Sequence, residues 1–328
     1  MNTQTESWIS AEVVALRELS ATVREITLRT AGGAIAWTVG SHLRVRIVHA
    51  DGRPDLRRYS LVGLPAPGAD WRIAVKRADP GRGGSAFMWR LALGDRIEVQ
   101  RPDNHFELPL GPRATLLLAG GIGITPLLGM ALALAPRRAE LRMVYAAPSS
   151  DELVYRAELE ASLGPRLQCL AGSRIDVDAE IAALAPSGQL LVCGPVPMLQ
   201  AVQAAWHRAR RPPQRLRFET FGNSGSAPAE AFWVELPRHE LAFAVPADRS
   251  LLEMLEVHGV ACLADCMRGE CGLCAVDVVE VHGTIDHRDV FFSVGEKAQG
   301  RKLCTCVSRV VGGGVVIDSA WRPDTLPP

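Results

Sequence analysis

Hydrophobic and polar residues alternate in short runs over the first hundred positions of the 328-residue chain. The clearest runs cover 11–16, 23–28, 42–48 and 71–76, and turns rich in Gly, Asp and Pro separate them. Strict alternation is typical of strands with one buried face. Evenly spaced strands of this kind predict a small antiparallel barrel.

The middle of the chain has continuous apolar runs instead. The runs at 114–119, 141–145, 167–170 and 190–193 predict buried strands, and the segments between them, including 127–134 and 151–163, predict helices. Alternation of strand and helix predicts an open parallel sheet. Thr125 is expected to cap the first of these helices and Pro126 to occupy its first turn.

The last third begins after a small polar linker at 223–229. Two short strands are predicted at 232–236 and 240–245, followed by a helix from Ser250. Ser250 and Glu253 have the spacing of a capping box. Strand, turn, strand and helix in this order indicate a β-grasp fold. Further on, the run from Asp286 to Asp289 is expected to form a surface turn.

Three cysteines lie within nine residues of this last region. Cys266, Cys271 and Cys274 have the C-x4-C-x2-C spacing of plant-type [2Fe-2S] ferredoxins, in which a distant cysteine is the fourth ligand. Here Cys304 or Cys306 would supply it. Gly269 and Gly272 fit a loop whose amides approach sulfur closely. A structural zinc site would favour paired C-x2-C motifs, and disulfides would suit a smaller secreted chain, so both alternatives are weaker.

Glycine-rich turns and one polar strand are the other candidate sites. Gly120, Gly121 and Gly123 join a buried strand to a helix, which is the arrangement of a pyrophosphate site. Gly83, Gly84 and Ser85 begin another helix, where unpaired amides could hold an anion. A strand carries Arg57, Tyr59 and Ser60, and Cys193, Gly194 and Pro195 end a further strand. Each pattern alone also fits an ordinary capped helix, a strand surface or a core cysteine.

Together these motifs resemble the phthalate dioxygenase reductase family of the ferredoxin reductase superfamily, over essentially the whole chain. The resemblance rests on Arg57-x-Tyr59-Ser60, on Gly84-Ser85, on the Gly-Gly-x-Gly-x-Thr-Pro run that ends at Pro126, and on Cys306-Val-Ser308-Arg309. It implies a flavin-binding antiparallel β-barrel (1–109), an α/β parallel-sheet NAD domain (110–222), a linker (223–229) and a C-terminal β-grasp [2Fe-2S] ferredoxin domain (230–328).

The resemblance also assigns roles to residues. Flavin phosphate would be bound by Arg57, Gly83, Gly84 and Ser85, and the isoalloxazine would be contacted by Tyr59 and Ser60. Cys306, which stands directly before Val-Ser-Arg, is favoured over Cys304 as the fourth cluster ligand. The other predicted cofactor-binding positions are Val75, Lys76, Gly120, Gly121, Gly123, Thr125, Pro126, Cys193, Gly194, Pro195 and Phe221.

Three cofactors follow from this resemblance: FMN, NADH and a [2Fe-2S] cluster. Val75-Lys76 is typical of the FMN-using members, so FMN is favoured over FAD. NADH is favoured over NADPH because the run after Tyr145 ends in Asp151 and lacks an arginine for a 2′-phosphate. The implied reaction passes two electrons from NADH to flavin and then single electrons through the cluster to a separate terminal oxygenase of the Rieske type. A cytochrome P450 is the alternative acceptor. A less favoured alternative is that the chain is a non-enzymatic iron-sulfur sensor that binds no flavin.

Charge and composition limit the classes of molecule that the chain is expected to bind. Lys plus Arg and Asp plus Glu both total 36, which favours neither nucleic acid nor a membrane as partner. Residues 230–328 nevertheless carry 15 acidic against 9 basic side chains, and electrostatic complementarity guides electron-transfer partners to one another. The start has no secretory pattern, so we expect a cytoplasmic protein. We also expect it to act as a monomer.

Overall fold

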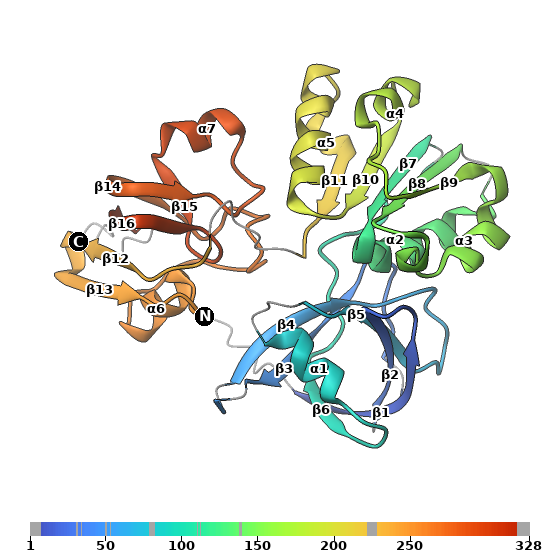
Figure 1. Cartoon of the computed structure of the whole chain (residues 1–328), viewed down its shortest axis with the longest axis horizontal. Coiled ribbons are helices and arrows are strands. Elements are labelled where there is room, and N and C mark those ends of the chain that lie inside the picture. The colour runs from blue at the N-terminus through green and yellow to red at the C-terminus, as the bar shows by residue number, and fades with distance from the viewer. Residues whose placement is uncertain are drawn as a thin grey trace, which may run out of the picture. The chain divides into compact units, whose positions relative to one another are not determined.

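The structure is a computed structural model that describes residues 8–30, 32–33, 35–49, 51–52, 54–78, 83–109, 111, 113–137, 140–221 and 228–319. The chain divides into two compact units, Met1–Glu219 and Thr220–Pro328. The first unit contains an antiparallel and a parallel sheet, and the second contains one mixed sheet (Figure 1). Most of the predicted linker lies outside the described residues.

The antiparallel sheet of the first unit closes into a barrel. Its described strands lie in the order β4-β3-β6-β1-β2-β5, and Leu61, directly after β4, forms a bridge with Ile73 of β5 that joins the two outer strands. Helix α1 adds Met88 to the barrel core. The elements are β1 (Ile9–Glu18), β2 (Val23–Thr30), β3 (His42–Val48), β4 (Pro54–Ser60), β5 (Trp71–Lys76), α1 (Gly84–Arg90) and β6 (Arg96–Val99).

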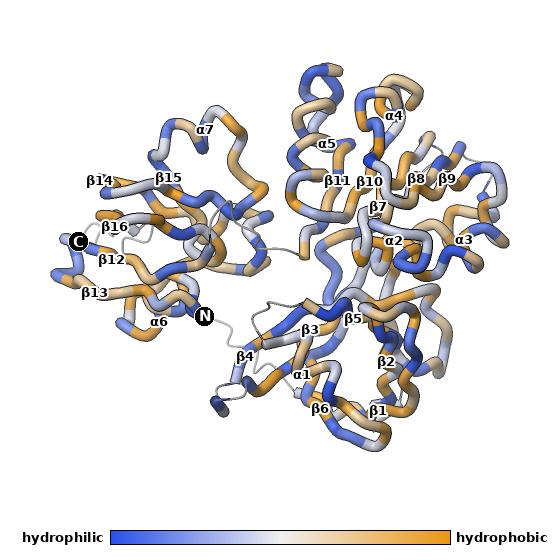
Figure 2. The backbone as a smooth tube through the Cα atoms, in the orientation of Figure 1, coloured by the Kyte–Doolittle hydropathy of each residue, from blue (hydrophilic) through white to orange (hydrophobic). Residues whose placement is uncertain are grey.

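The second sheet of this unit is parallel, with its strands in the order β11-β10-β7-β8-β9. Every residue of β7 and β10 is buried, as expected for strands covered by helices on both faces, and the strands of this sheet carry much of the hydrophobic colour in Figure 2. The elements are β7 (Thr115–Gly120), η1 (Gly121–Gly123), α2 (Ile124–Leu134), β8 (Leu141–Ala147), η2 (Ser150–Glu152), α3 (Arg156–Leu163), η3 (Gly164–Arg166), β9 (Leu167–Ala171), α4 (Val177–Ala183), β10 (Gln189–Cys193), α5 (Val196–Arg208), η4 (Pro213–Arg215) and β11 (Leu216–Glu219).

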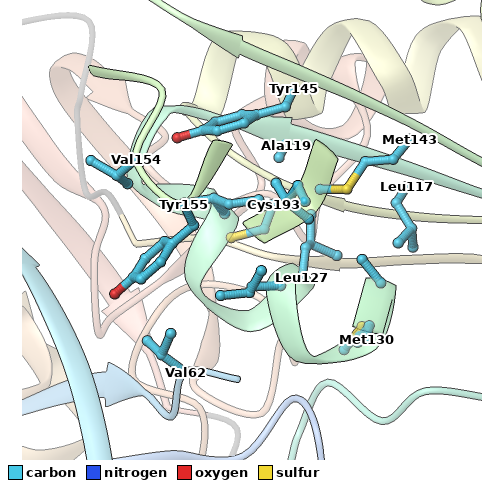
Figure 3. Packing of buried hydrophobic residues seen from close by; sticks show 14 of the residues in the cluster. Val62, Leu117, Ala119, Leu127, Met130, Met143, Tyr145, Val154, Tyr155 and Cys193 are labelled. Carbon is cyan, nitrogen blue, oxygen red and sulfur yellow. The ribbon is translucent and has the colours of Figure 1, made fainter. Parts of the chain in front are cut away.

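Barrel and parallel sheet share one hydrophobic core. Val62 and Phe106 of the barrel half belong to the same buried cluster as Leu127 of α2 and Cys193 of β10. Figure 3 shows Val62 on the barrel side of this cluster and Tyr155, the residue before α3, extending toward it. The shared core explains why the two sheets form a single compact unit.

Two helix boundaries differ from the sequence prediction. Helix α2 begins at Ile124 with Gly123 at its cap, because the 3-10 turn η1 runs directly into it. Thr125 is therefore not the cap, and its hydroxyl donates to the Ile122 carbonyl instead (3.0 Å). Pro126 lies at the third helical position, where a missing N–H still costs no helical hydrogen bond.

The predicted start of the helix at 151–163 is also wrong, whereas its end at Leu163 is confirmed. The turn η2 ends at Glu152, and α3 starts only at Arg156. Tyr155 breaks the run because it has a left-handed backbone, with φ of 63°. Its phenol donates a buried hydrogen bond to Glu25 of the barrel (2.8 Å). A long-range contact has overridden the local helical pattern.

The second unit has a mixed sheet in the order β13-β12-β16-β14-β15. Strands β12 and β16 pair in parallel and the other pairs are antiparallel. Leu251 and Leu255 of α6 pack into its core, and the predicted capping box of Ser250 and Glu253 is present. The elements are β12 (Phe232–Leu236), η5 (Pro237–His239), β13 (Leu241–Val245), α6 (Leu251–Val257), β14 (Ala275–Asp286), α7 (Val294–Gln299), β15 (Lys302–Cys304) and β16 (Arg309–Asp318).

Within the described ranges, none of the helices has the length and apolar character that a membrane span requires.

Candidate functional site

The first group of predicted site residues lies where β4 meets the start of α1. The Arg57 side chain lies directly over Gly84: a Cβ atom on Gly84 would come 2.8 Å from the Arg57 Nε atom and 2.9 Å from its Cγ atom. Gly83 caps the helix in the left-handed region, with φ of 80°. One glycine therefore permits the close approach of the guanidinium, and the other permits the turn.

Charged neighbours orient Arg57. Its Nη1 atom lies 2.6 Å from Asp55 Oδ1 and donates to the Leu56 carbonyl (2.9 Å). Burial raises the pKa of the Asp55 carboxyl, but the charge of Arg57 and a hydrogen bond from His49 outweigh burial and hold this pKa below its usual value. Asp55 is thus ionised at neutral pH and fixes the guanidinium at the helix start.

Ser85 is next to Gly84 on α1, and Tyr59 is two residues from Arg57 on β4. The Ser85 hydroxyl accepts a hydrogen bond from the Ala78 amide (3.1 Å), which joins α1 to the segment after β5. The Tyr59 phenol on β4 is partly buried against the barrel core. Burial raises its pKa well above the usual value, so the phenol stays protonated and neutral.

Two further predicted residues connect the barrel to the parallel sheet. Ser60 donates a buried hydrogen bond to Glu219 Oε2 (3.2 Å), and the Lys76 ammonium lies 2.9 Å from Glu152 Oε2. Val75, the neighbour of Lys76 on β5, is 2% exposed in the barrel core. These contacts hold β4 and β5, which carry the predicted flavin-binding residues, against the carboxyl edge of the parallel sheet.

Sequence reasoning missed Glu152 and Glu219. Glu219 is the last residue of β11 and is 1% exposed, while Glu152 lies in the turn that follows β8. A signal was present, because open α/β sheets bind ligands beyond the carboxyl ends of their strands. Polar residues at those ends therefore merit attention even without a motif.

The two glycine motifs of the parallel sheet meet at adjacent strand ends. A Cβ atom on Gly123 would lie 2.2 Å from the Cys193 carbonyl oxygen, and a Cβ atom on Gly120 would lie 2.7 Å from Pro195 Cδ. Gly194 also approaches Gly120 closely, since its own Cβ atom would lie 3.2 Å from the Gly120 Cα atom. Segments some seventy residues apart in the sequence thus form one glycine-lined corner.

This corner lies at the topological switch point of the sheet. Strand β7 comes first in the chain, β8 and β9 continue on one side of it, and β10 and β11 lie on the other. A crevice at such a point, outside the carboxyl ends of the strands, is where doubly wound sheets bind nucleotides. Gly121 has space around its Cα atom and a φ of 54°, so the backbone there can approach a ligand closely. The Cys193 side chain points into the hydrophobic core beside Leu127 (Figure 3).

Phe221 follows β11 by two residues and is 39% exposed. It belongs to the second compact unit. An exposed ring of this size is available to contact a flat ligand, which fits the cofactor-binding role that the resemblance implies for it.

The cysteine loop of the second unit forms a cradle around one sulfur. Cys266 Sγ accepts hydrogen bonds from the backbone amides of residues 268, 270 and 271, at 3.4, 3.3 and 3.4 Å. Gly269 and Gly272 have φ of 72° and 74°, as the sequence prediction requires of them. Burial raises the pKa of the Cys266 thiol, and the three amides directed at its sulfur partly offset this by favouring the thiolate. Such hydrogen bonds also set the potential of a bound cluster.

The remaining cysteines lie close to this loop. The sulfur atoms of Cys274 and Cys306 are 3.2 Å apart. Hydrogen bonds with the Cys304 and Cys306 side chains lower the pKa of Cys274 to about 3. Across the described residues, no group of three His, Cys, Asp or Glu side chains is arranged to hold one metal ion. A [2Fe-2S] cluster has a different requirement, because its four thiolates are divided between two irons.

The run from Asp286 to Asp289 is not the surface turn predicted from the sequence. Asp286 is 3% exposed, Arg288 is 9% exposed and Asp289 is fully buried. The Arg288 Nε atom donates to Asp286 (2.8 Å), so part of the charge is paired within the run. The prediction failed because a polar composition suggests exposure, whereas a buried charge survives when partners surround it.

Two family models match the chain. The "2Fe-2S iron-sulfur cluster binding domain" matches residues 234–311, and the "Oxidoreductase NAD-binding domain" matches residues 117–204. The cysteine loop falls within the first match, and both glycine motifs of the parallel sheet fall within the second.

Full-length relatives agree with these matches. The chain is 34% identical to the heme-dependent oxidative N-demethylase beta subunit of Ectopseudomonas mendocina, over 94% of this chain and 98% of that protein. It is 32% identical to the phthalate 4,5-dioxygenase oxygenase reductase subunit of Pseudomonas putida, over 95% and 97%. Among solved structures, phthalate dioxygenase reductase matches with a TM-score of 0.75 and 27% identity, over 97% of this chain and all of that chain.

Proposed function

The chain belongs to the phthalate dioxygenase reductase family, and on this premise we propose that it carries electrons from NADH through FMN and a [2Fe-2S] cluster to a terminal oxygenase of the Rieske type. It is an NAD-dependent oxidoreductase of the electron-transfer kind. FMN, when bound, supplies the exchange between a two-electron donor and a one-electron acceptor. The terminal oxygenase is a separate protein, so the organic substrate is selected elsewhere.

The cradle around Cys266 carries this proposal. Three backbone amides directed at one sulfur serve a thiolate, and glycine is needed at residues 269 and 272 for the loop to take this shape. The proposed cluster ligands are Cys266, Cys271, Cys274 and Cys306. Cys306 is supported as the fourth because its sulfur interacts with Cys274, with Cys266 and with the Gly269 amide.

NADH binding is assigned to the corner at the switch point. Gly120, Gly121 and Gly123 bring the backbone close to a pyrophosphate, while Gly194 and Pro195 border the same space. The exposed Asp151 after β8 would repel a 2′-phosphate, which favours NADH. Thr125 and Pro126 support the corner from within α2.

FMN binding is assigned to the corner between β4 and α1. Arg57, Gly84 and Ser85 would bind its phosphate, and Tyr59 and Ser60 would face its ring. The juxtaposition of Arg57 with Gly84 supports this assignment, because a cation beside a glycine at a helix start can reach a phosphate that backbone amides also contact. The proposal also includes a division into a flavin domain (1–109), an NAD domain (110–222), a linker (223–229) and a ferredoxin domain (230–328). It further includes a cytoplasmic location and a monomeric state.

Removal of the Arg57 guanidinium is expected to release the flavin. Charge-assisted hydrogen bonds contribute about 1.5–3 kcal/mol, so Arg57→Ala should weaken flavin affinity roughly ten- to hundredfold. Flavin fluorescence during titration of deflavinated protein measures the affinity, and mass spectrometry of the extracted cofactor identifies it. Arg46→Ala is the control, since this exposed arginine on β3 pairs with Glu98 and should leave affinity unchanged. Equal flavin affinities in both variants would show that Arg57 does not bind the flavin. Extraction of FAD would refute the assignment of FMN as the cofactor.

The nature of the acceptor needs its own test, because one relative belongs to a heme-dependent system. Purified protein, NADH and a Rieske oxygenase component are expected to give faster NADH-dependent reduction of the acceptor than the same protein with a heme acceptor such as a cytochrome P450. Stopped-flow spectra of the two acceptors report the rates directly. A higher rate with the heme protein would replace the Rieske assignment and leave the cofactor assignments intact.

A further inference from the structure

Asp289 is a fully buried carboxylate with no role in the function described so far. A charge removed from water costs several kcal/mol unless partners compensate it, so its position requires a reason. It follows β14 and precedes α7, in the second unit.

The partners of this carboxylate come from two directions. Oδ2 accepts a hydrogen bond from the Phe292 amide (2.9 Å), and Oδ1 accepts one from the Ser308 hydroxyl (3.2 Å). The Lys297 ammonium lies 3.6 Å from Oδ2, and His287 Nδ1 lies 3.4 Å from Oδ1. Lys297 also donates to the Asp289 carbonyl. Hydrogen bonds and positive charge together keep the carboxylate ionised.

Asp289 touches both segments that carry cysteines. On one side is the loop: a Cβ atom on Gly269, which lies between Cys266 and Cys271, would come 2.7 Å from the Asp289 Cα atom. The Val290 amide also donates to the Gly269 carbonyl (2.9 Å). On the other side is Ser308, two residues after Cys306. Asp289 therefore joins the two segments, through its backbone on the side of the cysteine loop and through its carboxylate on the side of Ser308.

Its charge lies close to the same segments: the carboxylate is fully buried and accepts the hydrogen bond of Ser308, two residues after Cys306. In a buried environment such a charge is weakly screened. Reduction adds one electron to a [2Fe-2S] cluster, and a fixed negative charge beside it opposes that addition.

We propose that Asp289 is a positioning residue of the cluster, which holds the Cys306 segment against the cysteine loop and, as a buried negative charge, lowers the one-electron reduction potential of the cluster. This inference rests on the proposed ligation of a [2Fe-2S] cluster in this unit. Lys297 has the opposite electrostatic effect, because it partly neutralises the carboxylate.

The test is a reductive titration of the full-length protein and two variants, followed by the visible and electron paramagnetic resonance spectra of the cluster. Asp289→Asn keeps the side-chain shape and removes the charge. At a fixed potential its ratio of reduced to oxidised cluster should rise about tenfold, which is about 59 mV for a one-electron couple. Lys297→Gln keeps an N–H donor and exposes the full negative charge, so its ratio should fall.

Asp277→Asn is the matched control. It removes one negative charge from the same unit, but Asp277 is exposed and pairs with the exposed Lys302, so water and salt screen it. Its potential should equal that of the unchanged protein. Shifts of the same sign for Asp289→Asn and Lys297→Gln, or no shift in either, would overturn the inference. If Asp289→Asn loses its iron, the sign of the Lys297→Gln shift decides alone.

The result separates this inference from the proposed function. Absence of a [2Fe-2S] spectrum in the unchanged protein would refute the proposed function. A normal spectrum with unaltered potentials in both variants would refute only the role of Asp289.

Discussion

Cys306→Ser is expected to abolish the [2Fe-2S] spectrum, whereas Cys304→Ser is expected to keep it. The Cys306 sulfur interacts with Cys266, with Cys274 and with the Gly269 amide of the loop. Cys304 ends β15, and its backbone pairs with Ala275. A serine there should preserve the strand and leave all four proposed ligands in place. Iron and sulfide per chain, with the visible spectrum, measure the outcome.

Two comparisons make this result decisive. Cys266→Ser, Cys271→Ser and Cys274→Ser should each lose the spectrum as Cys306→Ser does, while Cys262→Ser, outside the proposed ligand set, should resemble Cys304→Ser. Loss with Cys304→Ser together with retention in Cys306→Ser would reverse the assignment of the fourth ligand. Retention in every variant would mean that these cysteines hold no cluster.

The second large effect is expected from truncation within the 223–229 linker. The remaining chain contains the whole of the compact unit Met1–Glu219 and keeps Phe221. NADH-dependent reduction of a soluble dye should continue, because a small acceptor can meet the flavin directly. Reduction of a protein acceptor should fall to the rate measured without reductase, since the proposed cluster is absent. Few contacts are expected to be lost when a chain is cut between compact units.

Full-length Cys266→Ser is the control for this experiment. It retains the second unit and loses the proposed cluster, so it should match the truncated protein in both assays. If the truncated protein reduced a protein acceptor at the full rate, electrons would not pass through the second unit. If Cys266→Ser transferred electrons and the truncated protein did not, the second unit would serve docking alone.

Local patterns predicted most of the fold. Alternating residues in 23–28 and 71–76 are strands β2 and β5, and the continuous apolar runs are the buried strands of the parallel sheet. These predictions succeed because burial of one face or of both faces imposes its own periodicity. Predictions failed where distant contacts decide the backbone. Tyr155 interrupts a helical pattern to reach Glu25.

The candidate cofactor motifs could be predicted from local sequence: the C-x4-C-x2-C spacing, the glycine turns and the Arg-x-Tyr-Ser strand are recognisable because cofactor binding demands particular residues at short range. How these motifs combine depends on tertiary contacts. It brought Gly120 against Gly194, placed Arg57 over Gly84, and buried Asp289 between two cysteine segments. Such contacts join residues that are far apart in the chain. A local pattern of polarity does not predict them, because the same charged residue type can be either buried or exposed.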